Sequence, residues 1–322
     1  MDTRTYEDFH AEVMALYNEQ KYGEMYDLLT AEGERFTDRA QEYEVLYLRS
    51  CMAARTGQTE LALSLIRESL DRGLWHGEEV LRRSPSWQSL QGNPEFERLA
   101  EESIKMSAAA YVGPQMEVVE PEGGCLPMNP CPVVIALHGN GSNIQQTMRG
   151  WRPALDMGWA LAALQSSQMS GPTTFIWDNQ ETALRELGEH YAALVSGHSV
   201  DPKRVVLAGF SMGGETALRA ALTGTIPVKG FVLLGPGGPS INDSEPEVWA
   251  PLIEKAAGRG LRGYVMFGEA DDTIPHDGIR RIVEMLNEGG IPTGLEVIPN
   301  TRHEYPPDFA DYARRALEHI EA

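Results

Sequence analysis

The sequence predicts an α/β fold, a mostly parallel sheet flanked by helices, preceded by an all-α region of helical hairpins. Residues 5 to about 106 contain amphipathic helical patterns and few strand-like runs. From residue 113 onward, short apolar strand patterns alternate with helical ones, as a mostly parallel sheet requires. The 322 residues also exceed a typical single domain. We therefore expect two domains, residues 1–112 and residues 113–322.

Helical periodicity in the first domain covers four stretches, residues 12–20, 24–35, 41–54 and 60–72. Residues 22–29 recur loosely as residues 59–66, an offset of 37 that is close to the tetratricopeptide period. Residues 84–96 are typical of the turn and cap that follow such repeats. The region therefore resembles a tetratricopeptide-type segment, and an unrelated helical appendage is the alternative.

The second domain is predicted to contain seven strands and six helices, joined by short intervals. The strands are expected at residues 115–119, 133–137, 160–164, 204–208, 230–234, 263–267 and 295–298. The helices are expected at residues 143–148, 180–195, 212–223, 247–258, 278–288 and 307–320. No long insertion follows residue 234, so we expect a compact domain without a lid of its own.

Residues 205–214 read Val-Val-Leu-Ala-Gly-Phe-Ser-Met-Gly-Gly, an apolar strand that leads through Gly-x-Ser-x-Gly into a helix. The five-residue pattern alone occurs by chance. The strand before it and the helix after it, however, place Ser211 on a tight turn that exposes the hydroxyl and admits only small neighbours. Ser211 is therefore the candidate nucleophile, and a bystander serine in a glycine-rich loop is the alternative.

A serine hydroxyl needs a base to take its proton before it becomes a good nucleophile. Of the eight histidines, His303 lies in the loop after the last predicted strand. Catalytic residues of open α/β sheets gather at such strand ends. His138 ends an earlier strand and His276 opens a helix, whereas the other five lie in the first domain or beside polar helix faces. His303 is the predicted base.

The third member should be a carboxylate that lies between the serine and the histidine in chain order, again at the end of a strand. The loop after residue 267 offers Glu269, Asp271 and Asp272. We prefer Asp271, which would hold the imidazole in its correct tautomer and stabilise the imidazolium that forms during attack. The unused neighbours would solvate the loop or cap the next helix.

The tetrahedral intermediate needs hydrogen-bond donors for its oxyanion. The backbone N–H of Met212, which starts the helix after the nucleophile, is one predicted donor. The glycine-rich loop that begins at His138 should supply the second. We assign it to the N–H of Asn140, with Gly139 or Gly141 as alternatives, and give His138 a structural role in orienting the loop.

These motifs resemble the α/β-hydrolase superfamily and, within it, the phospholipase/carboxylesterase group of small esterases and thioesterases. The resemblance covers about residues 113–322 and rests on His-Gly-x-Gly at 138–141, Gly-Phe-Ser-Met-Gly-Gly at 209–214, Gly-x-x-Asp-x-x-Ile-Pro at 268–275, and His303. It implies a hydrolase without metal or cofactor that forms an acyl-enzyme on Ser211 and hydrolyses it with water activated by His303. The small members consist of the catalytic domain alone, so the N-terminal helices depart from their pattern.

The substrate pocket is the least visible part of the site. Trp151, Trp177, Met169 and Trp249 lie in or near loops at the expected active face, as does Met212. They are candidates for an apolar acyl pocket, and burial in the core is the alternative. The missing internal lid favours soluble esters with short to medium acyl chains. We expect the N-terminal helices to pack over the mouth of the site, where they would do part of a lid's work.

Composition and charge restrict the partners. The formal net charge of −20 and the lack of a basic stripe argue against nucleic acid or an anionic membrane surface. No signal peptide and no 18-residue apolar run occur, so we expect a cytoplasmic protein with a small-molecule ester as substrate. The N-terminal helices are a candidate surface for self-association or protein contact.

The three cysteines, Cys51, Cys125 and Cys131, have no metal-ligand spacing with histidines, and we predict no metal. Cys125 and Cys131 could bridge the stretch between them, but free thiols are expected in a reducing compartment.

Three functions fit these observations. A carboxylic-ester hydrolase is preferred. A serine peptidase or acyl-aminoacyl hydrolase is the second, because the prolyl oligopeptidase group shares the domain and the triad order, although its large propeller is missing here. The third is a non-catalytic protein that binds a partner through its helices, since a fold does not guarantee chemistry. The intact set of Ser211, Asp271 and His303 weighs against the third.

Overall fold

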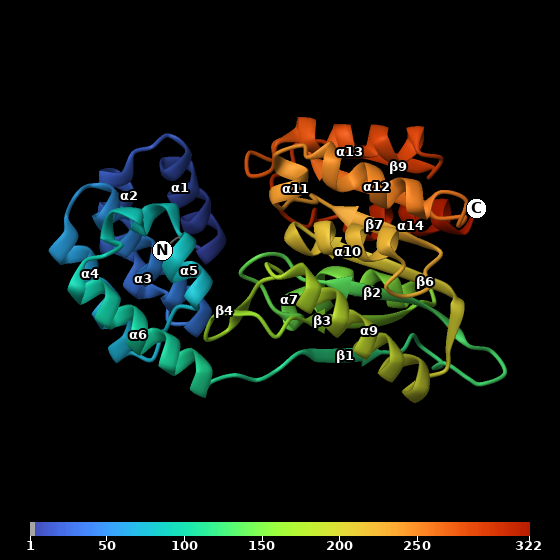
Figure 1. The fold of residues 1–322 in the computed structure, drawn as a ribbon, viewed down its shortest axis with the longest axis horizontal. Coiled ribbons are helices and arrows are strands. Elements are labelled where there is room, and N and C mark those ends of the chain that lie inside the picture. The colour runs from blue at the N-terminus through green and yellow to red at the C-terminus, as the bar shows by residue number, and fades with distance from the viewer. Residues whose placement is uncertain (1–3) are drawn as a thin grey trace. The chain divides into compact units, whose positions relative to one another are not determined.

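The computed structural model describes residues 4–322, which divide into two compact units (Figure 1). We call the unit formed by the residues up to 112 together with residues 169–174 the helical unit. Residues 113–168 and 175–322 form the sheet unit. The chain thus leaves the sheet unit after residue 168, contributes a short segment to the helical unit, and returns at residue 175. Sequence patterns do not predict this excursion.

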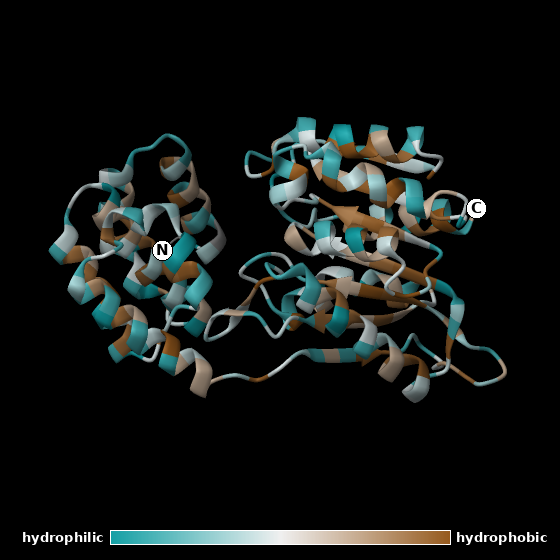
Figure 2. Ribbon diagram, viewed as in Figure 1, coloured by the Kyte–Doolittle hydropathy of each residue, from teal (hydrophilic) through white to brown (hydrophobic). Residues whose placement is uncertain are grey.

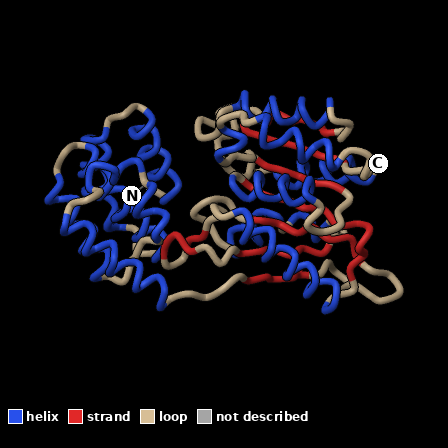
Figure 3. Tube along the Cα trace, in the orientation of Figure 1, coloured by secondary structure: helices blue, strands red, loops and turns tan. Residues whose placement is uncertain are grey.

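The helical unit is built from six α-helices and two short 3-10 helices in the described residues (Figure 3). They are α1 (Tyr6–Asn18), α2 (Tyr22–Glu32), η1 (Gly33–Arg35), α3 (Arg39–Arg55), α4 (Thr59–Asp71), α5 (Glu78–Arg83), η2 (Pro85–Leu90) and α6 (Pro94–Ala109). The four predicted helices correspond to α1–α4. The predicted closing turn forms η2 and then starts α6, where the Asn93 side chain accepts hydrogen bonds from the N–H groups of Glu95 and Phe96.

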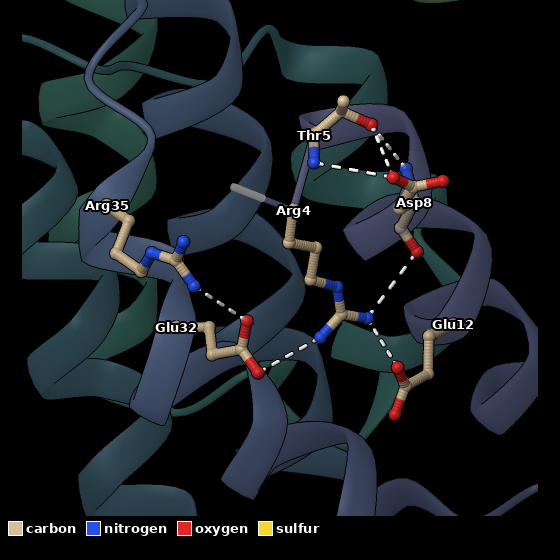
Figure 4. A network of polar contacts seen from close by, with 6 residues as sticks. All are labelled: Arg4, Thr5, Asp8, Glu12, Glu32 and Arg35. Atoms are coloured by element: carbon tan, nitrogen blue, oxygen red, sulfur yellow. Dashed lines mark hydrogen bonds and ion pairs between the residues drawn. The ribbon is translucent and has the colours of Figure 1, made fainter. Parts of the chain in front are cut away.

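A polar network ties the start of α1 to the end of α2 (Figure 4). Thr5 and Asp8 form a capping box, in which the Thr5 hydroxyl accepts from the Asp8 N–H at 3.1 Å and the Asp8 carboxylate accepts from the Thr5 N–H. Arg4 donates to Glu32 at 3.0 Å and also pairs with Glu12. The charges hold together two helices whose apolar faces share the core of the unit.

The sheet unit contains a seven-stranded sheet in the order β1-β3-β2-β6-β7-β8-β9. The strands are β1 (Gln115–Val119), β2 (Cys131–Leu137), β3 (Ala160–Gln165), β6 (Val200–Phe210), β7 (Gly230–Leu234), β8 (Arg262–Gly268) and β9 (Thr293–Ile298). All neighbours pair in parallel except β1, which runs antiparallel to β3 at one edge. The predicted mostly parallel sheet is confirmed. Two further short strands, β4 (Met169–Gly171) and β5 (Thr174–Phe175), pair with each other and have no sequence signal.

Helices cover both faces of this sheet, as a parallel sheet requires. They are α7 (Ile144–Trp151), α8 (Pro153–Asp156), α9 (Gln180–Gly197), α10 (Met212–Thr223), α11 (Pro239–Asn242), α12 (Pro246–Ala256), α13 (His276–Glu288) and α14 (Phe309–Glu321). Alternate residues of β2 enter opposite cores: Val133 and Ile135 belong to the core that includes residues of α9, α10, α12 and α13, whereas Val134 belongs to the core that includes residues of α7, α8 and α14. Figure 2 shows the resulting apolar strands between more polar helices. No helix in residues 4–322 is long and apolar enough to cross a membrane.

Cys125 and Cys131 form a disulfide, so the expectation of free thiols at these positions is wrong. Cys131 starts β2, and the chain turns back before it because the Glu120 carboxylate accepts a hydrogen bond from the Cys125 N–H. The two Cα atoms are 5.2 Å apart, within the usual range for a bridge. Disulfides persist mainly in oxidising surroundings, which weighs against the predicted cytoplasmic location. Cys51 is a buried free cysteine in the helical unit.

Candidate active site

Ser211 lies between the end of β6 and the first residue of α10. Its backbone has φ 52° and ψ −125°, a conformation that non-glycine residues rarely adopt. Neighbouring backbone holds it there, since the Ser211 N–H donates to the Leu234 carbonyl at 3.1 Å and the Ser211 carbonyl accepts from Gly237 at 3.1 Å. Strain of this kind is retained where the surrounding structure fixes it, and it clusters at functional sites.

Two positions of the same motif must be glycine because other backbone segments approach them too closely for a side chain. A Cβ at Gly209 would lie 2.3 Å from the Gly213 carbonyl oxygen, and a Cβ at Gly213 would lie 2.3 Å from the His138 carbonyl oxygen. Neither position can accept a side chain without moving backbone. The Gly-x-Ser-x-Gly spacing is therefore a steric requirement of the turn, which explains why this pattern is informative in the sequence.

His303 and Asp271 form a tight pair in the loops after β9 and β8. The His303 Nδ1–H donates to Asp271 Oδ2 at 2.7 Å, which leaves Nε2 as the acceptor nitrogen. Asp271 Oδ1 accepts from the N–H groups of Thr273 at 2.9 Å and Ile274 at 3.1 Å. Burial raises the pKa of Asp271, but these hydrogen bonds and the charge of His303 outweigh it and hold the pKa below its usual value. The pair is thus a carboxylate that orients an imidazole.

The other carboxylates considered from the sequence differ from Asp271 in their exposure. Asp272 and Glu269 are exposed, and a Glu269 oxygen accepts from the Asn300 N–H. The Asp271 side chain is 1 % exposed and the His303 side chain 15 % exposed. His276, the histidine that opens α13, packs on the Phe267 ring.

His303 and Ser211 converge at the end of β7. The His303 ring stacks on Phe210, the residue before the serine, with ring centroids 4.7 Å apart. A Cβ at Gly235 would lie 3.2 Å from the His303 ring, and Gly235 directly follows Leu234, which accepts the Ser211 N–H. Among the described residues, the Ser211 hydroxyl makes no hydrogen bond to His303. Catalytic hydrogen bonds are often long before substrate binds.

Replacing Gly235 with alanine should lower kcat/KM for an ester substrate by about 10- to 100-fold, because small displacements of a catalytic group have effects of this size. The added Cβ would press on the imidazole and lie 3.5 Å from Asp271 Oδ2, at a residue with φ +49°. Gly258→Ala is the matched control, since Gly258 has φ +78° and nothing within 4 Å of an added Cβ. Melting temperatures are measured alongside kcat/KM. Equal losses of kcat/KM in both variants would assign the effect to backbone strain alone.

The loop after β2 lies beside Ser211, and the hydrogen bonds of this loop exclude one of the candidate oxyanion donors. A Cβ at Gly139 would lie 3.4 Å from the Ser211 Cβ. The Gly141 N–H already donates to the Phe175 carbonyl at 3.0 Å, so it is not available as an alternative donor. Met212 is the first residue of α10, and its N–H therefore has no acceptor within the helix. Asn140 and Met212 remain the proposed donors, with Gly139 as the alternative to Asn140.

The His138 ring orients this loop through two hydrogen bonds. Its Nδ1–H donates to the Gly139 carbonyl at 2.8 Å, and its Nε2 accepts from the Ser166 N–H at 3.2 Å. Burial lowers the pKa of His138 to about 4, although the Gly139 contact opposes the shift, so the ring is neutral at pH 7. The ring stacks on Trp177, whose indole N–H donates to the His138 carbonyl at 2.9 Å. These bonds match the loop-orienting role expected of His138.

The structure corrects the predicted pocket. Trp151, Trp177 and Trp249 are each 1 % exposed and pack inside the two cores of the sheet unit, so they offer no surface to a substrate. Met169 lies in the segment that packs with the helical unit. An indole fills a core as readily as it lines a pocket, and sequence patterns alone do not separate the two.

One partly buried aromatic residue that was not predicted contacts His303 instead, and a second packs against the first. Phe210 stacks on His303, and Tyr305 lies 5.0 Å from Phe210 between ring centroids. A Cβ at Gly150 of α7 would lie 2.5 Å from the Tyr305 ring, so the helix packs directly against it. Both aromatic residues stand within two positions of a predicted catalytic residue, which is the only signal the sequence offers. No cluster that could hold a metal ion occurs in the described part of the chain.

The arrangement is that of the α/β-hydrolase fold. A mostly parallel sheet carries a serine turn at the end of β6, and a carboxylate and a histidine follow β8 and β9 in the order expected for these enzymes.

Comparison with known proteins agrees with this class. Residues 165–319 match the model of the dienelactone hydrolase family, and residues 5–111 match the model of the A/B hydrolase-like N-terminal domain. Over 98 residues the chain is 29 % identical to acyl-protein thioesterase 1 of Mycosarcoma maydis, a stretch that covers 29 % of this chain and 36 % of that protein. The match thus spans about a third of the length of this relative.

Two solved structures share the fold. An uncharacterized protein from Bacillus cereus ATCC 10987 is 25 % identical, with a TM-score of 0.54 over 99 % of this chain and all of that one. Esterase PE8 is 20 % identical, with a TM-score of 0.54 over 65 % of this chain and all of that one. Together the comparisons support a hydrolase of ester bonds. The tetratricopeptide resemblance of the N-terminal helices stays a prediction.

Proposed function

We propose that this protein is a serine hydrolase that cleaves carboxylic esters with short to medium acyl chains through an acyl-enzyme on Ser211. The observation that carries the proposal is the convergence at the end of β7. There Ser211, strained at positive φ, and His303, oriented by Asp271, both lie against the segment that holds Leu234 and Gly235. This combination of nucleophile, base and orienting carboxylate is the one that acyl transfer needs.

The proposed reaction runs in two halves. His303 Nε2 takes the proton of the Ser211 hydroxyl as Oγ attacks the carbonyl carbon, and the carbonyl oxygen becomes an oxyanion that accepts from the N–H groups of Asn140 and Met212. Collapse of this intermediate expels the alcohol, which receives the proton from His303. A water molecule then loses a proton to His303 and attacks the acyl carbon. Collapse of this second intermediate releases the acid, and His303 returns the proton to the Ser211 oxygen.

Asp271 would act through the imidazole. Its bond to Nδ1–H keeps Nε2 free to accept the serine proton, and its charge stabilises the imidazolium. The N–H groups of Thr273 and Ile274 favour the carboxylate form of Asp271 throughout the cycle.

An apolar acyl group is supported by the aromatic residue beside His303. Phe210 is partly buried and stacks on the His303 ring, and the partly buried Tyr305 packs against Phe210. The matched relative is named acyl-protein thioesterase 1, and this name supports hydrolysis of an acyl group without defining the leaving group here.

A panel of p-nitrophenyl esters, from acetate through butyrate and octanoate to palmitate, tests the proposal when it is compared with a p-nitroanilide of the same acyl group. We expect turnover of the shorter esters, a decline toward palmitate, and little turnover of the anilide. Anilide cleavage without ester cleavage would favour the peptidase. Absence of both, together with no labelling of Ser211 by a fluorophosphonate, would favour a non-catalytic protein.

A further inference from the structure

The excursion of the chain into the helical unit is a short arm, residues 169–174 (Figure 1). It contains β4 and the first residue of β5, which pair with each other, and the Ser170 hydroxyl donates to the Thr174 hydroxyl oxygen at 3.0 Å. The residues that flank the arm are also bonded to each other, since the Ile176 N–H donates to the Gln168 carbonyl at 2.9 Å. The arm therefore has a defined shape, and its last residue directly precedes Phe175 of the sheet unit.

The helical unit holds the arm by its backbone. The Ser170 carbonyl accepts two hydrogen bonds, from the Tyr43 hydroxyl at 3.0 Å and from the Gly77 N–H at 2.9 Å. Packing is close on both sides, since a Cβ at Gly77 would lie 2.4 Å from the Met169 carbonyl oxygen and a Cβ at Gly171 would lie 2.6 Å from the Tyr43 ring. Ser170 and Tyr43 are both buried. Buried hydrogen bonds and close packing therefore hold the arm in the helical unit.

A buried polar cluster contacts the Tyr43 hydroxyl and sets the direction of its hydrogen bond. His76 Nδ1 lies 3.1 Å from the Tyr43 hydroxyl oxygen, and the His76 backbone N–H and carbonyl both bond the Ser103 hydroxyl at 2.7 Å. Burial lowers the pKa of His76 to about 3, so the ring is neutral at pH 7. Because the Ser170 carbonyl can only accept, the Tyr43 hydroxyl donates its one proton to the arm, and His76 Nδ1–H is then the donor to the Tyr43 oxygen.

Phe175, the residue that follows the arm, is bonded to the glycine-rich loop that begins at His138 and holds the proposed donor Asn140, which we call the oxyanion loop. The Phe175 carbonyl accepts from the Gly141 N–H at 3.0 Å, and the Phe175 N–H donates to the Ser142 carbonyl at 2.9 Å. Gly141 and Ser142 directly follow Asn140, the proposed oxyanion donor. The arm, which is bonded to Tyr43 and Gly77, is therefore separated by one peptide bond from Phe175, the residue that pairs with the oxyanion loop.

We propose that Tyr43 is a positioning residue for the catalytic site, which anchors the arm in the helical unit and thereby holds Phe175 and the oxyanion loop in register. The inference rests on the proposed function and extends it to the N-terminal helices. Oxyanion donors act mainly on the transition state, so loosening the loop should lower kcat and leave KM nearly unchanged.

Tyr43→Phe tests this directly, because it removes the hydroxyl and keeps the ring. Tyr47→Phe is the matched control from the same helix, α3, where the Tyr47 hydroxyl bonds Ser84 at 3.0 Å and the ring also packs on His76. We expect Tyr43→Phe to lower kcat by about 10-fold, less than the roughly 10²- to 10³-fold effect of deleting an oxyanion donor. KM should stay within about twofold, and Tyr47→Phe should match the wild type. Equal kcat in the two variants would overturn the inference.

Hydrogen exchange of the Gly141 and Phe175 amides gives a readout that needs no activity. Both amides should exchange faster in Tyr43→Phe than in Tyr47→Phe, at equal melting temperature or after correction for global stability. Unchanged exchange would overturn the inference even if kcat fell. If wild-type protein hydrolyses no ester, the proposed function fails on that result, and the exchange comparison alone decides whether Tyr43 holds the loop.

Discussion

Replacing Ser211 with alanine is expected to lower kcat/KM for p-nitrophenyl butyrate by about 10⁴- to 10⁶-fold, the range in which removal of a serine nucleophile falls. The residual rate would come from binding and from the oxyanion donors alone. Because the Ser211 backbone is held by bonds to Leu234 and Gly237, the alanine variant should keep the fold and melt within a few degrees of the wild type.

Purified Ser211→Ala and wild-type protein are compared at equal concentration, with Ser196→Ala as the control. Ser196 is an exposed residue of α9 whose hydroxyl bonds a carbonyl one turn earlier in its own helix. It should retain wild-type kcat/KM. Activity of Ser211→Ala above about a hundredth of the wild-type value would count against a serine acyl-enzyme.

Asp271→Asn is expected to lower kcat by about 10³- to 10⁴-fold, while the fold is retained. Asparagine keeps the shape of the side chain but has lost the charge that stabilises the imidazolium. Its amide can also donate to Nδ1, which favours the tautomer with the proton on Nε2. That tautomer cannot accept the proton of Ser211.

Asp272→Asn is the control for this variant because it makes the same chemical change at the adjacent, exposed position. We expect a change in kcat of less than about threefold, since the pair with His303 at 2.7 Å is made by Asp271. A larger loss of kcat in Asp272→Asn than in Asp271→Asn would show that the assignment of the acid is wrong.

Local patterns carried most of the fold and the positions of the proposed triad. Strands β1 and β7 have their predicted bounds, because short apolar runs bounded by turn residues define them within a few positions. The steric need for Gly209 and Gly213 makes the serine turn recognisable from five residues. Chain order then limits the base and the acid to a few candidates, of which His303 and Asp271 lie in contact.

What the sequence did not predict depends on contacts between distant positions. The arm is held by Tyr43 and Gly77, far from it in the chain, and its six residues carry no strand pattern. The approach of Gly235 to His303 has the same origin. The Cys125–Cys131 bridge is a different case: the two residues are only six positions apart, and free thiols were expected because a reducing compartment was assumed. The tryptophans were misassigned because burial in a core and exposure in a pocket suit the same side chain.

Labelling of the wild-type protein with a fluorophosphonate, followed by mapping of the modified peptide by mass spectrometry, shows whether Ser211 is the acyl nucleophile. We expect one adduct per chain, on Ser211, formed in parallel with loss of ester turnover and absent after Ser211→Ala. An adduct on another residue, or complete loss of ester turnover without a modified Ser211, would contradict this role of Ser211.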